Sequence, residues 1–337
     1  MANRSLIHAL PKAELHLHLE GTVAPETLAE LSRKHDAVPL TLEQAQKLYG
    51  YADFHGFMMA FKAVTQRLLT AKDFELVTYR MMESLHRQKV LHAEVYISVG
   101  AVHWRQHEFE PLFEGIERGR ERGTRDFGVS VLWIFDAVRH FGVEPARRVF
   151  ELAVQYQDRN VIGIGIGGDE RRGPAEPFRS LYDYAAENGL RRTAHAGETT
   201  GPGSIWEALN IGAERIGHGL TAIQDADLME ILATRQVPVE VCLTSNLRTG
   251  CLTDLQQHPV RRMFDEGLLL TLNSDDPAMF HTSLTNEYEI AQDLFGFTDE
   301  HLRELARNSF EAAFLQAEKK VQFLERFDAE CNRLMAT

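Results

Sequence analysis

Short apolar runs, many of them β-branched, recur along the chain, and each ends in polar residues. Between them lie longer stretches with the 3.6-residue period of a helix, such as residues 226–236 and 258–267. Eight runs are predicted strands: ELHLHL from Glu14, AEVYISV from Ala93, FGVSVLWIF from Phe127, VIGIGIG from Val161, RRTAHAG from Arg191, RIGHG from Arg215, PVEVCL from Pro238 and LLLTLN from Leu268. Eight strands alternating with helices predict an α/β fold, a closed parallel (β/α)8 or TIM barrel.

Two helical regions extend this pattern. A helical insertion of about residues 23–89 follows the first strand, and a helical C-terminal tail of about residues 281–337 is expected to pack on the barrel wall. Inside the insertion, four apolar residues fall at i, i+3, i+4 and i+7: Phe54, Phe57, Met58 and Phe61. This spacing predicts one apolar helix face, which either faces the core or forms a lid over an apolar ligand.

The chain reads as one domain over residues 1–337. No linker rich in proline, glycine or serine divides it, and a barrel of about 250 residues with additions accounts for the length. In a barrel of this kind, side chains at the C-terminal ends of the strands line the active face. We therefore expect the chemistry to lie where the eight runs end.

Charge and cysteine content exclude several classes of partner. The formal net charge is -13, from 36 Lys and Arg against 49 Asp and Glu, so no nucleic-acid polymer or anionic membrane is expected as a partner. Cys242, Cys251 and Cys331 are too few for a disulfide framework, which predicts a cytoplasmic protein. Neither a signal peptide nor a membrane span is expected. The composition leaves the oligomeric state open.

Two histidines, His16 and His18, end the first predicted strand. Because they are two residues apart, both imidazoles project to the same side of the pleat, where they suit Zn²⁺ or Fe²⁺. The alternative is a pair of hydrogen-bonded barrel histidines. Similar residues close the fifth, sixth and eighth strands: His195, His218, Asp275 and Asp276.

Counting ligands narrows the kind of metal site. His16, His18, His195 and one carboxylate, from Asp275 or Asp276, supply three nitrogens and one oxygen, with an open position for water. That set predicts a hydrolytic site. Many barrel hydrolases with this histidine pair hold two metals bridged by a carboxylated lysine on the fourth strand. No lysine occurs here between Lys89 and Lys319, so one metal is favoured, with two metals bridged by a carboxylate as the alternative.

Hydrolysis also needs groups that move protons. Glu198, three residues after His195, is expected at the mouth of the barrel as an acid or base, with a capping or solvated carboxylate as the alternative. His218 is expected to orient the water or accept its proton, unless it is a fourth metal ligand or a hydrogen-bonded barrel histidine. Gly167 and Gly168 either let the backbone approach a ligand closely or serve barrel packing.

The ordered set of motifs resembles the adenosine deaminase family of the amidohydrolase superfamily. The motifs are LPKAELHLHLEG from Leu10, GDE from Gly168, HAGE from His195, ERIGHG from Glu214, EVCLTSN from Glu240 and LNSDDPAMF from Leu272. The resemblance implies a zinc-dependent hydrolase with one Zn²⁺ per chain. It also implies hydrolytic replacement of a purine 6-amino group by oxygen, through a tetrahedral intermediate, with loss of ammonia.

Carried over by motif position, the resemblance implies a role for each residue. The zinc ligands are His16, His18, His195 and Asp275. Glu198 protonates purine N1, and His218 positions and deprotonates the water, so that both are catalytic together with Asp275. The substrate-binding set is Asp276 at N7, the Gly168 backbone amide at N3, Glu20, His18 and Phe57. The other zinc deaminase class needs a C-x-x-C motif, which this chain lacks.

The family contains three related activities, and this sequence combines features of them. Glu20 stands where animal adenosine deaminases carry an Asp that binds the ribose 5′-hydroxyl, and adenine deaminases often have Glu there. IGHG from Ile216 is similar to the nucleoside enzymes. Tyr96 replaces an arginine of many adenosine deaminases, and with HAGETTGP and NSDDPAMFHTSLTNEY it resembles the aminodeoxyfutalosine deaminases of menaquinone synthesis.

We therefore expect a small 6-aminopurine nucleoside as substrate, either adenosine or a 5′-extended adenosine such as aminodeoxyfutalosine. Adenine deamination is the alternative activity. A catalytically inactive binding protein and a lactonase or amidase on the same barrel are the competing classes. The first would hold zinc without releasing ammonia, and the second would contain two metals per chain or act on esters.

Overall fold

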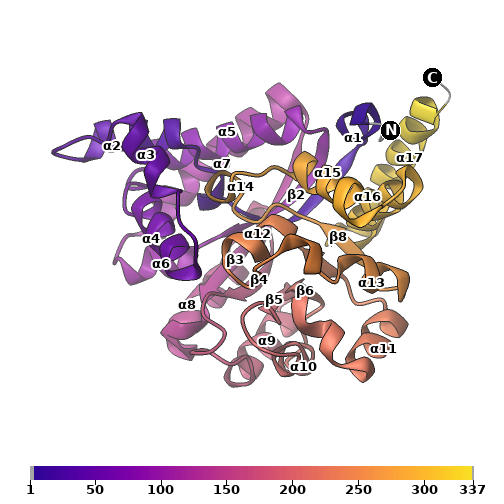
Figure 1. The fold of residues 1–337 in the computed structure, drawn as a ribbon. Coiled ribbons are helices and arrows are strands. Elements are labelled where there is room, and N and C mark those ends of the chain that lie inside the picture. The colour runs from indigo at the N-terminus through magenta and orange to yellow at the C-terminus, as the bar shows by residue number, and fades with distance from the viewer. Residues whose placement is uncertain (1–3, 336–337) are drawn as a thin grey trace.

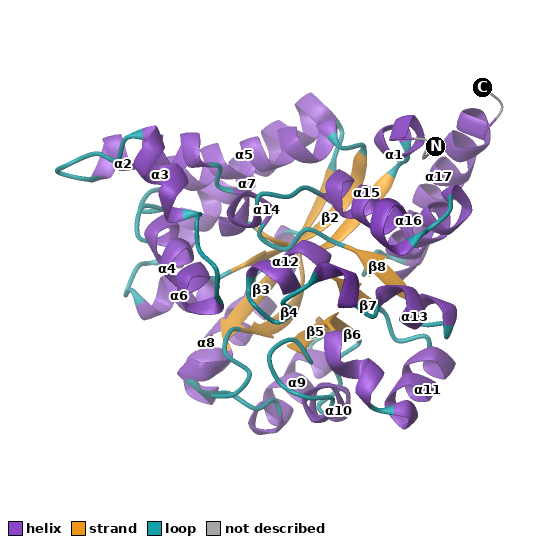
Figure 2. Cartoon of the chain, viewed as in Figure 1, coloured by secondary structure: helices purple, strands orange, loops and turns teal. Residues whose placement is uncertain are grey.

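A parallel eight-stranded sheet at the centre of the molecule is surrounded by helices (Figure 2). This computed structural model describes residues 4–335. The strands follow one another around the sheet in chain order: β1 Lys12–His18, β2 Val90–Ile97, β3 Ser130–Val138, β4 Val161–Gly167, β5 Arg191–Ala196, β6 Arg215–His218, β7 Val239–Val241 and β8 Leu270–Leu272. Each predicted run overlaps one of these strands, so the (β/α)8 barrel is confirmed.

The seam between β8 and β1 closes just beyond the end of β8. The His18 backbone N–H donates to the Asp275 carbonyl at 2.9 Å, and the Asp275 N–H donates to the His16 carbonyl at 3.0 Å. The Asn273 side-chain oxygen accepts from the backbone N–H of Leu15 at 2.9 Å and of His16 at 3.1 Å. The first and last strands are therefore joined at the same residues that carry the predicted metal ligands.

The insertion after β1 consists of helices, as expected: α2 Pro25–His35, α3 Leu42–Leu48, α4 Phe54–Thr65 and α5 Ala71–Arg87. The Asp53 side chain caps α4 by accepting from the Gly56 N–H at 2.8 Å. Helix α5 packs on α7 Phe109–Phe127, where a Cβ at Gly115 would overlap the Ala71 carbonyl group. The insertion is thus fixed to the barrel wall at one end and carries α4 over the barrel mouth.

The other helices connect the strands and form the tail. They are α1 Arg4–Ala9, α6 Val99–Trp104, α8 Val143–Gln155, α9 Arg179–Glu187, α10 Gly203–Asn210, α11 Ala226–Arg235, α12 Leu243–Arg248, α13 Val260–Asp265, α14 Pro277–Phe280, α15 Leu284–Phe295, α16 Asp299–Ala312 and α17 Ala317–Met335. Helices α15 and α16 contact β8, and α17 packs on α16 (Figure 1). The Ala13 backbone N–H of β1 donates to Ser309 of α16 at 3.1 Å, so the tail packs on the barrel wall as expected.

Charged side chains, as well as apolar ones, fill the barrel interior. The Arg215 guanidinium pairs with the carboxylates of Glu94 and Glu240, and all three side chains are fully buried. Phe314, from the segment after α16, lies under Arg215 with its ring centre 3.7 Å from the guanidinium carbon. This network links β2, β6 and β7 inside the barrel. None of the described helices has the length and hydrophobicity needed to cross a membrane.

Candidate active site

Four predicted ligands meet at the C-terminal end of the barrel. His16 and His18 come from β1, His195 from β5, and Asp275 from the segment after β8. His18 Nε2 lies 3.2 Å from His195 Nε2 and 3.3 Å from Asp275 Oδ1, and His16 Nε2 lies 3.5 Å from the same oxygen. All four residues are buried. The structure thus brings residues from three parts of the chain into one cluster.

The distances between the donor atoms fit a metal ion. His16 Nδ1 donates to the Glu240 carboxylate at 2.8 Å and His195 Nδ1 donates to the Ile166 carbonyl at 3.1 Å, so in the neutral form of each ring Nε2 carries the lone pair. His16 Nε2 is buried without a hydrogen-bond partner. Ligand bonds of about 2.0–2.1 Å in a tetrahedron separate the ligands by about 3.3–3.4 Å. His16, His18 and Asp275 form one possible ligand group, and His195 adjoins it through its 3.2 Å approach to His18.

His218 lies at the edge of this cluster. Its Nε2 is 3.7 Å from Glu198 Oε2 and 4.0 Å from Asp275 Oδ2. It also falls within a possible ligand group with His16 and His195, so the arrangement alone leaves its role as ligand or base open. His218 and Asp275 have left-handed backbones, with φ of 65° and 63°, which cost about 1–2 kcal/mol each outside glycine. Such strain is typical of functional positions.

Neighbouring groups hold the cluster in place. The Ser245 hydroxyl donates to Asp275 Oδ2 at 2.7 Å. The absence of a side chain at two glycines also makes room for the cluster. A Cβ at Gly217 of β6 would lie 2.8 Å from the His16 ring. A Cβ at Gly167 would lie 3.3 Å from the His195 ring. Glycine at these two positions leaves the space that the imidazole rings occupy.

The loop after β5 carries Glu198 and is fastened by Glu170. The Glu170 carboxylate accepts from the backbone N–H groups of Gly197 at 3.1 Å, Glu198 at 2.9 Å and Thr199 at 3.1 Å. It also accepts from the Thr200 hydroxyl at 2.6 Å. Glu170 is buried, so this cradle fixes the backbone from which the Glu198 side chain extends.

The surroundings of Glu198 favour its neutral form. Burial, followed by the charges of Asp275 and Glu170, raises the pKa of Glu198 to about 8. A protonated carboxyl is a hydrogen-bond donor and can deliver a proton at neutral pH. The predicted proton donor is therefore placed beside the cluster in the state that donation requires.

An inner pocket of about 90 Å³ leads from the cluster toward α4. Its inner end is polar, with Glu198, Asp275 and Asp276, while its outer end is apolar, with Phe54, Phe57, Met58, Phe61 and Phe280. Gly168, another lining residue, has a φ of 93°. Asp276 Oδ1 is buried without a partner. A flat ring with a polar edge fits this polarity, and the four-residue stripe of α4 covers the pocket.

Glu20 lies behind the inner pocket. One of its oxygens accepts from the Ser98 backbone N–H at 3.1 Å, and the other is buried without a partner. Both residues line a small cavity of about 10 Å³ together with Arg105, and Ser98 alone of the three also lines the inner pocket. Contact between Glu20 and a substrate stays a prediction.

Sequence reasoning assigned no function to Glu240, Glu170 or the Tyr96 ring. The Tyr96 hydroxyl donates to Glu240 Oε2 at 3.2 Å, and its ring stacks on His18 at 4.9 Å. Glu240 and Glu170 lie in the motifs EVCLTSN and GDE, so a signal was present. Their roles depend on contacts across the barrel that residue spacing does not show.

Fold and site together define a (β/α)8 hydrolase with a histidine and aspartate cluster at the C-terminal ends of its strands. The chain belongs to the adenosine deaminase family, whose model matches residues 11–330. It is a hydrolytic deaminase.

Known relatives differ in their substrates. An aminodeoxyfutalosine deaminase of Streptomyces avermitilis is 37% identical, over 96% of this chain and 92% of that protein. An adenine deaminase of Streptomyces coelicolor is also 37% identical, over 97% of each chain. The crystal structure of a Burkholderia ambifaria amidohydrolase with bound Zn is 26% identical, with a TM-score of 0.88 over 99% of this chain and 95% of that one.

Proposed function

We propose that the protein catalyses zinc-dependent hydrolytic deamination of a 6-aminopurine nucleoside, giving the 6-oxopurine and ammonia. The substrate is adenosine or a 5′-extended adenosine such as aminodeoxyfutalosine. The observation that carries the proposal is the buried Glu198 carboxyl, whose pKa is raised to about 8, beside four converging donor atoms. A purine ring resists addition of water at C6 unless N1 is protonated, so this acid supplies the missing requirement.

His16, His18, His195 and Asp275 would hold the zinc ion. When bound, zinc lowers the pKa of a coordinated water and so supplies a nucleophile at neutral pH. The donor distances support this ligand set, and a relative with bound Zn supports the choice of metal. One ion per chain fits the four donors.

The remaining residues bind the purine and move its protons. Glu198 donates a proton to N1, which draws electrons from C6. His218 Nε2, 3.7 Å from Glu198 Oε2, accepts the proton of the attacking water. Burial raises the pKa of Asp276, so its protonated carboxyl, whose Oδ1 has no partner in the protein, donates to purine N7, and the Gly168 amide donates to N3. Collapse at C6 then expels the amino group, which leaves as ammonia after gaining a proton.

Adenine deaminase is the second candidate. A relative with that activity is as similar to this chain as the aminodeoxyfutalosine deaminase is, at 37% identity each. Nucleoside recognition is supported by IGHG from Ile216, and a 5′-extended substrate by HAGETTGP from His195. Preference for aminodeoxyfutalosine would place the protein in menaquinone biosynthesis.

Ammonia release separates these activities. Zinc-loaded protein is given adenosine, adenine or aminodeoxyfutalosine at equal concentration, and loss of the 6-amino chromophore is followed in the ultraviolet. We expect the highest kcat/KM with a nucleoside. Faster turnover of adenine would establish the alternative activity, and no ammonia from any of the three would refute both.

A further inference from the structure

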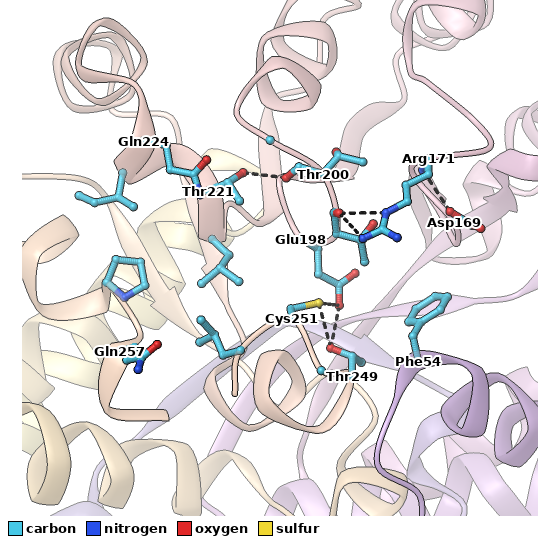
Figure 3. A pocket seen from close by; sticks show the side chains of 17 residues that line it. Phe54, Asp169, Arg171, Glu198, Thr200, Thr221, Gln224, Thr249, Cys251 and Gln257 are labelled. Atoms are coloured by element: carbon cyan, nitrogen blue, oxygen red, sulfur yellow. Dashed lines mark hydrogen bonds between the residues drawn. The ribbon is translucent and has the colours of Figure 1, made fainter. Parts of the chain in front are cut away.

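A second space, the outer cavity, lies beside the inner pocket and has a volume of about 580 Å³. Segments that follow β4, β5, β6 and β7 form most of its wall (Figure 3). Phe54, Glu198 and Thr249 line both spaces. The inner pocket and the outer cavity therefore meet at the proposed proton donor.

The side chain of Glu198 makes no tight contact at this junction. Its carboxyl accepts from the Thr249 hydroxyl at 3.5 Å and from the Cys251 thiol at 3.9 Å, both long for their type. Figure 3 shows this carboxyl near Thr249 and Cys251, with Arg171 and Phe54 across the space. A chemical group placed next to Glu198 would not have to displace a strong hydrogen bond.

The chemistry of deamination orients the purine relative to this junction. If C6 lies at the cluster and N1 at Glu198, then C2 lies beside Glu198 and farther from the cluster, because C2 is bonded to N1 on the side away from C6. Gly168 lines the inner pocket and its neighbour Asp169 lines the outer cavity. The outer cavity therefore adjoins the ring edge that contains C2.

Polar groups line part of the outer cavity, among them Asp169 and Arg171. The Arg171 guanidinium is held by the Thr199 carbonyl, at 3.3 and 3.4 Å. The Asp169 carboxylate accepts from the Arg171 backbone N–H at 3.1 Å. Further polar lining residues are Thr199, Thr200, Thr221 and Gln224. Donors and acceptors are both available, which suits a substituent that forms hydrogen bonds.

We propose that the outer cavity is a subsite for a hydrogen-bonding substituent at C2 of the 6-aminopurine, such as an alkylamino group. The enzyme then accepts 2-substituted 6-aminopurines as a substrate class. This inference rests on the proposed function, because it uses the position of N1 at Glu198.

Two glycines provide a matched pair of variants. Gly201 lines the outer cavity, and a Cβ there would have no atom within 4 Å, so Gly201→Phe should narrow the space without strain. Gly203, the first residue of α10, has the same freedom and does not line the cavity, so Gly203→Phe is the control. Gln224→Trp, at another lining position, also narrows the cavity and replaces Gly201→Phe if that variant does not fold.

The experiment measures kcat/KM for adenosine and for 2-(2-hydroxyethylamino)adenosine. If adenine is the preferred substrate, it measures the corresponding pair of free bases. We expect the native enzyme to accept both compounds within about tenfold of each other. Gly201→Phe should lower kcat/KM for the 2-substituted compound by about tenfold or more and leave the unsubstituted compound unchanged, whereas Gly203→Phe should affect neither.

Either of two results would overturn the subsite. One is deamination of adenosine by the native enzyme with a kcat/KM at least about a hundredfold lower for the 2-substituted compound, which would leave the proposed function intact. Equal effects of Gly201→Phe on both compounds would place the substituent elsewhere. Absence of ammonia from every aminopurine would instead refute the proposed function, and the subsite with it.

Discussion

The proposed proton transfer depends on the carboxyl group of Glu198. Glu198→Gln keeps the shape of the side chain but cannot deliver a proton to N1. We expect kcat to fall by about 10²–10⁴-fold, the usual contribution of a general acid, while zinc content and melting temperature stay unchanged. Glu187→Gln, at an exposed position of α9, is the control. Near-normal kcat in the Glu198 variant would refute the assignment.

The same residue predicts a pH dependence. Burial and the carboxylates of Asp275 and Glu170 raise the pKa of Glu198 to about 8, and the acid form is the active one. The rate should therefore be sustained at neutral pH and fall as pH rises through about 8. The pH profile of kcat checks this, and the residual rate of Glu198→Gln should lack the alkaline fall. A native rate that rises throughout this range would mean that Glu198 acts as a base.

The two adjacent aspartates should respond differently to removal. Asp276→Ala is expected to lower kcat/KM by about 10–100-fold, the cost of leaving the buried purine N7 without its hydrogen-bond donor, with the metal retained. Asp275→Ala is expected to lose the metal, because its Oδ1 lies 3.3 Å from His18 Nε2 and 3.5 Å from His16 Nε2. Metal analysis of both variants tests this, and the opposite pattern would show that the roles are exchanged.

At the scale of elements, strands β2, β6 and β7 jointly support a ligand of β1. Glu240 of β7 binds His16 of β1, Tyr96 of β2 and Arg215 of β6. Carboxylates that orient a metal-bound histidine typically change metal affinity by about 10–100-fold when altered. We expect Glu240→Gln to raise the zinc Kd by about that factor, measured by competition with a chelator.

Two variants separate this effect from general damage to the barrel interior. Glu94→Gln also alters a partner of Arg215 but does not touch His16, so its zinc Kd should stay near the native value. Tyr96→Phe keeps the ring stacked on His18 and loses only the hydroxyl, so its effect should be smaller than that of Glu240→Gln. An unchanged Kd in Glu240→Gln would remove Glu240 from this role.

The order of strands and helices could be predicted from the sequence, but contacts between side chains of distant strands could not. Parallel strands bring their C-terminal ends together, so the positions of His16, His195 and Asp275 followed from the alternation of strands and helices. Glu240 lies 224 residues from His16, and nothing local in either strand indicates that their side chains meet. Likewise, the position of Glu20 behind Ser98 depends on how α6 and the insertion pack, which periodicity does not determine.

The segment after α16 packs against the charged network inside the barrel. The Phe314 N–H donates to the Glu94 carboxylate, its ring lies under Arg215, and the residue is only 3% exposed. Phe314→Ala should lower the free energy of unfolding by about 3–5 kcal/mol, as measured by denaturant unfolding. Val321→Ala, at a position 53% exposed on α17, should change it little. A loss below about 1 kcal/mol at Phe314 would contradict this role.

The seam of the barrel gives the proposed metal a second consequence. Asp275 joins β8 to β1 through its backbone and offers an oxygen to the same centre as His16 and His18 through its side chain. These ligands come from the first and last strands, so they meet only after nearly the whole chain has been synthesised and the sheet has closed. Metal binding would therefore require a closed barrel, and chains in which the first and last strands have not met would not retain the ion.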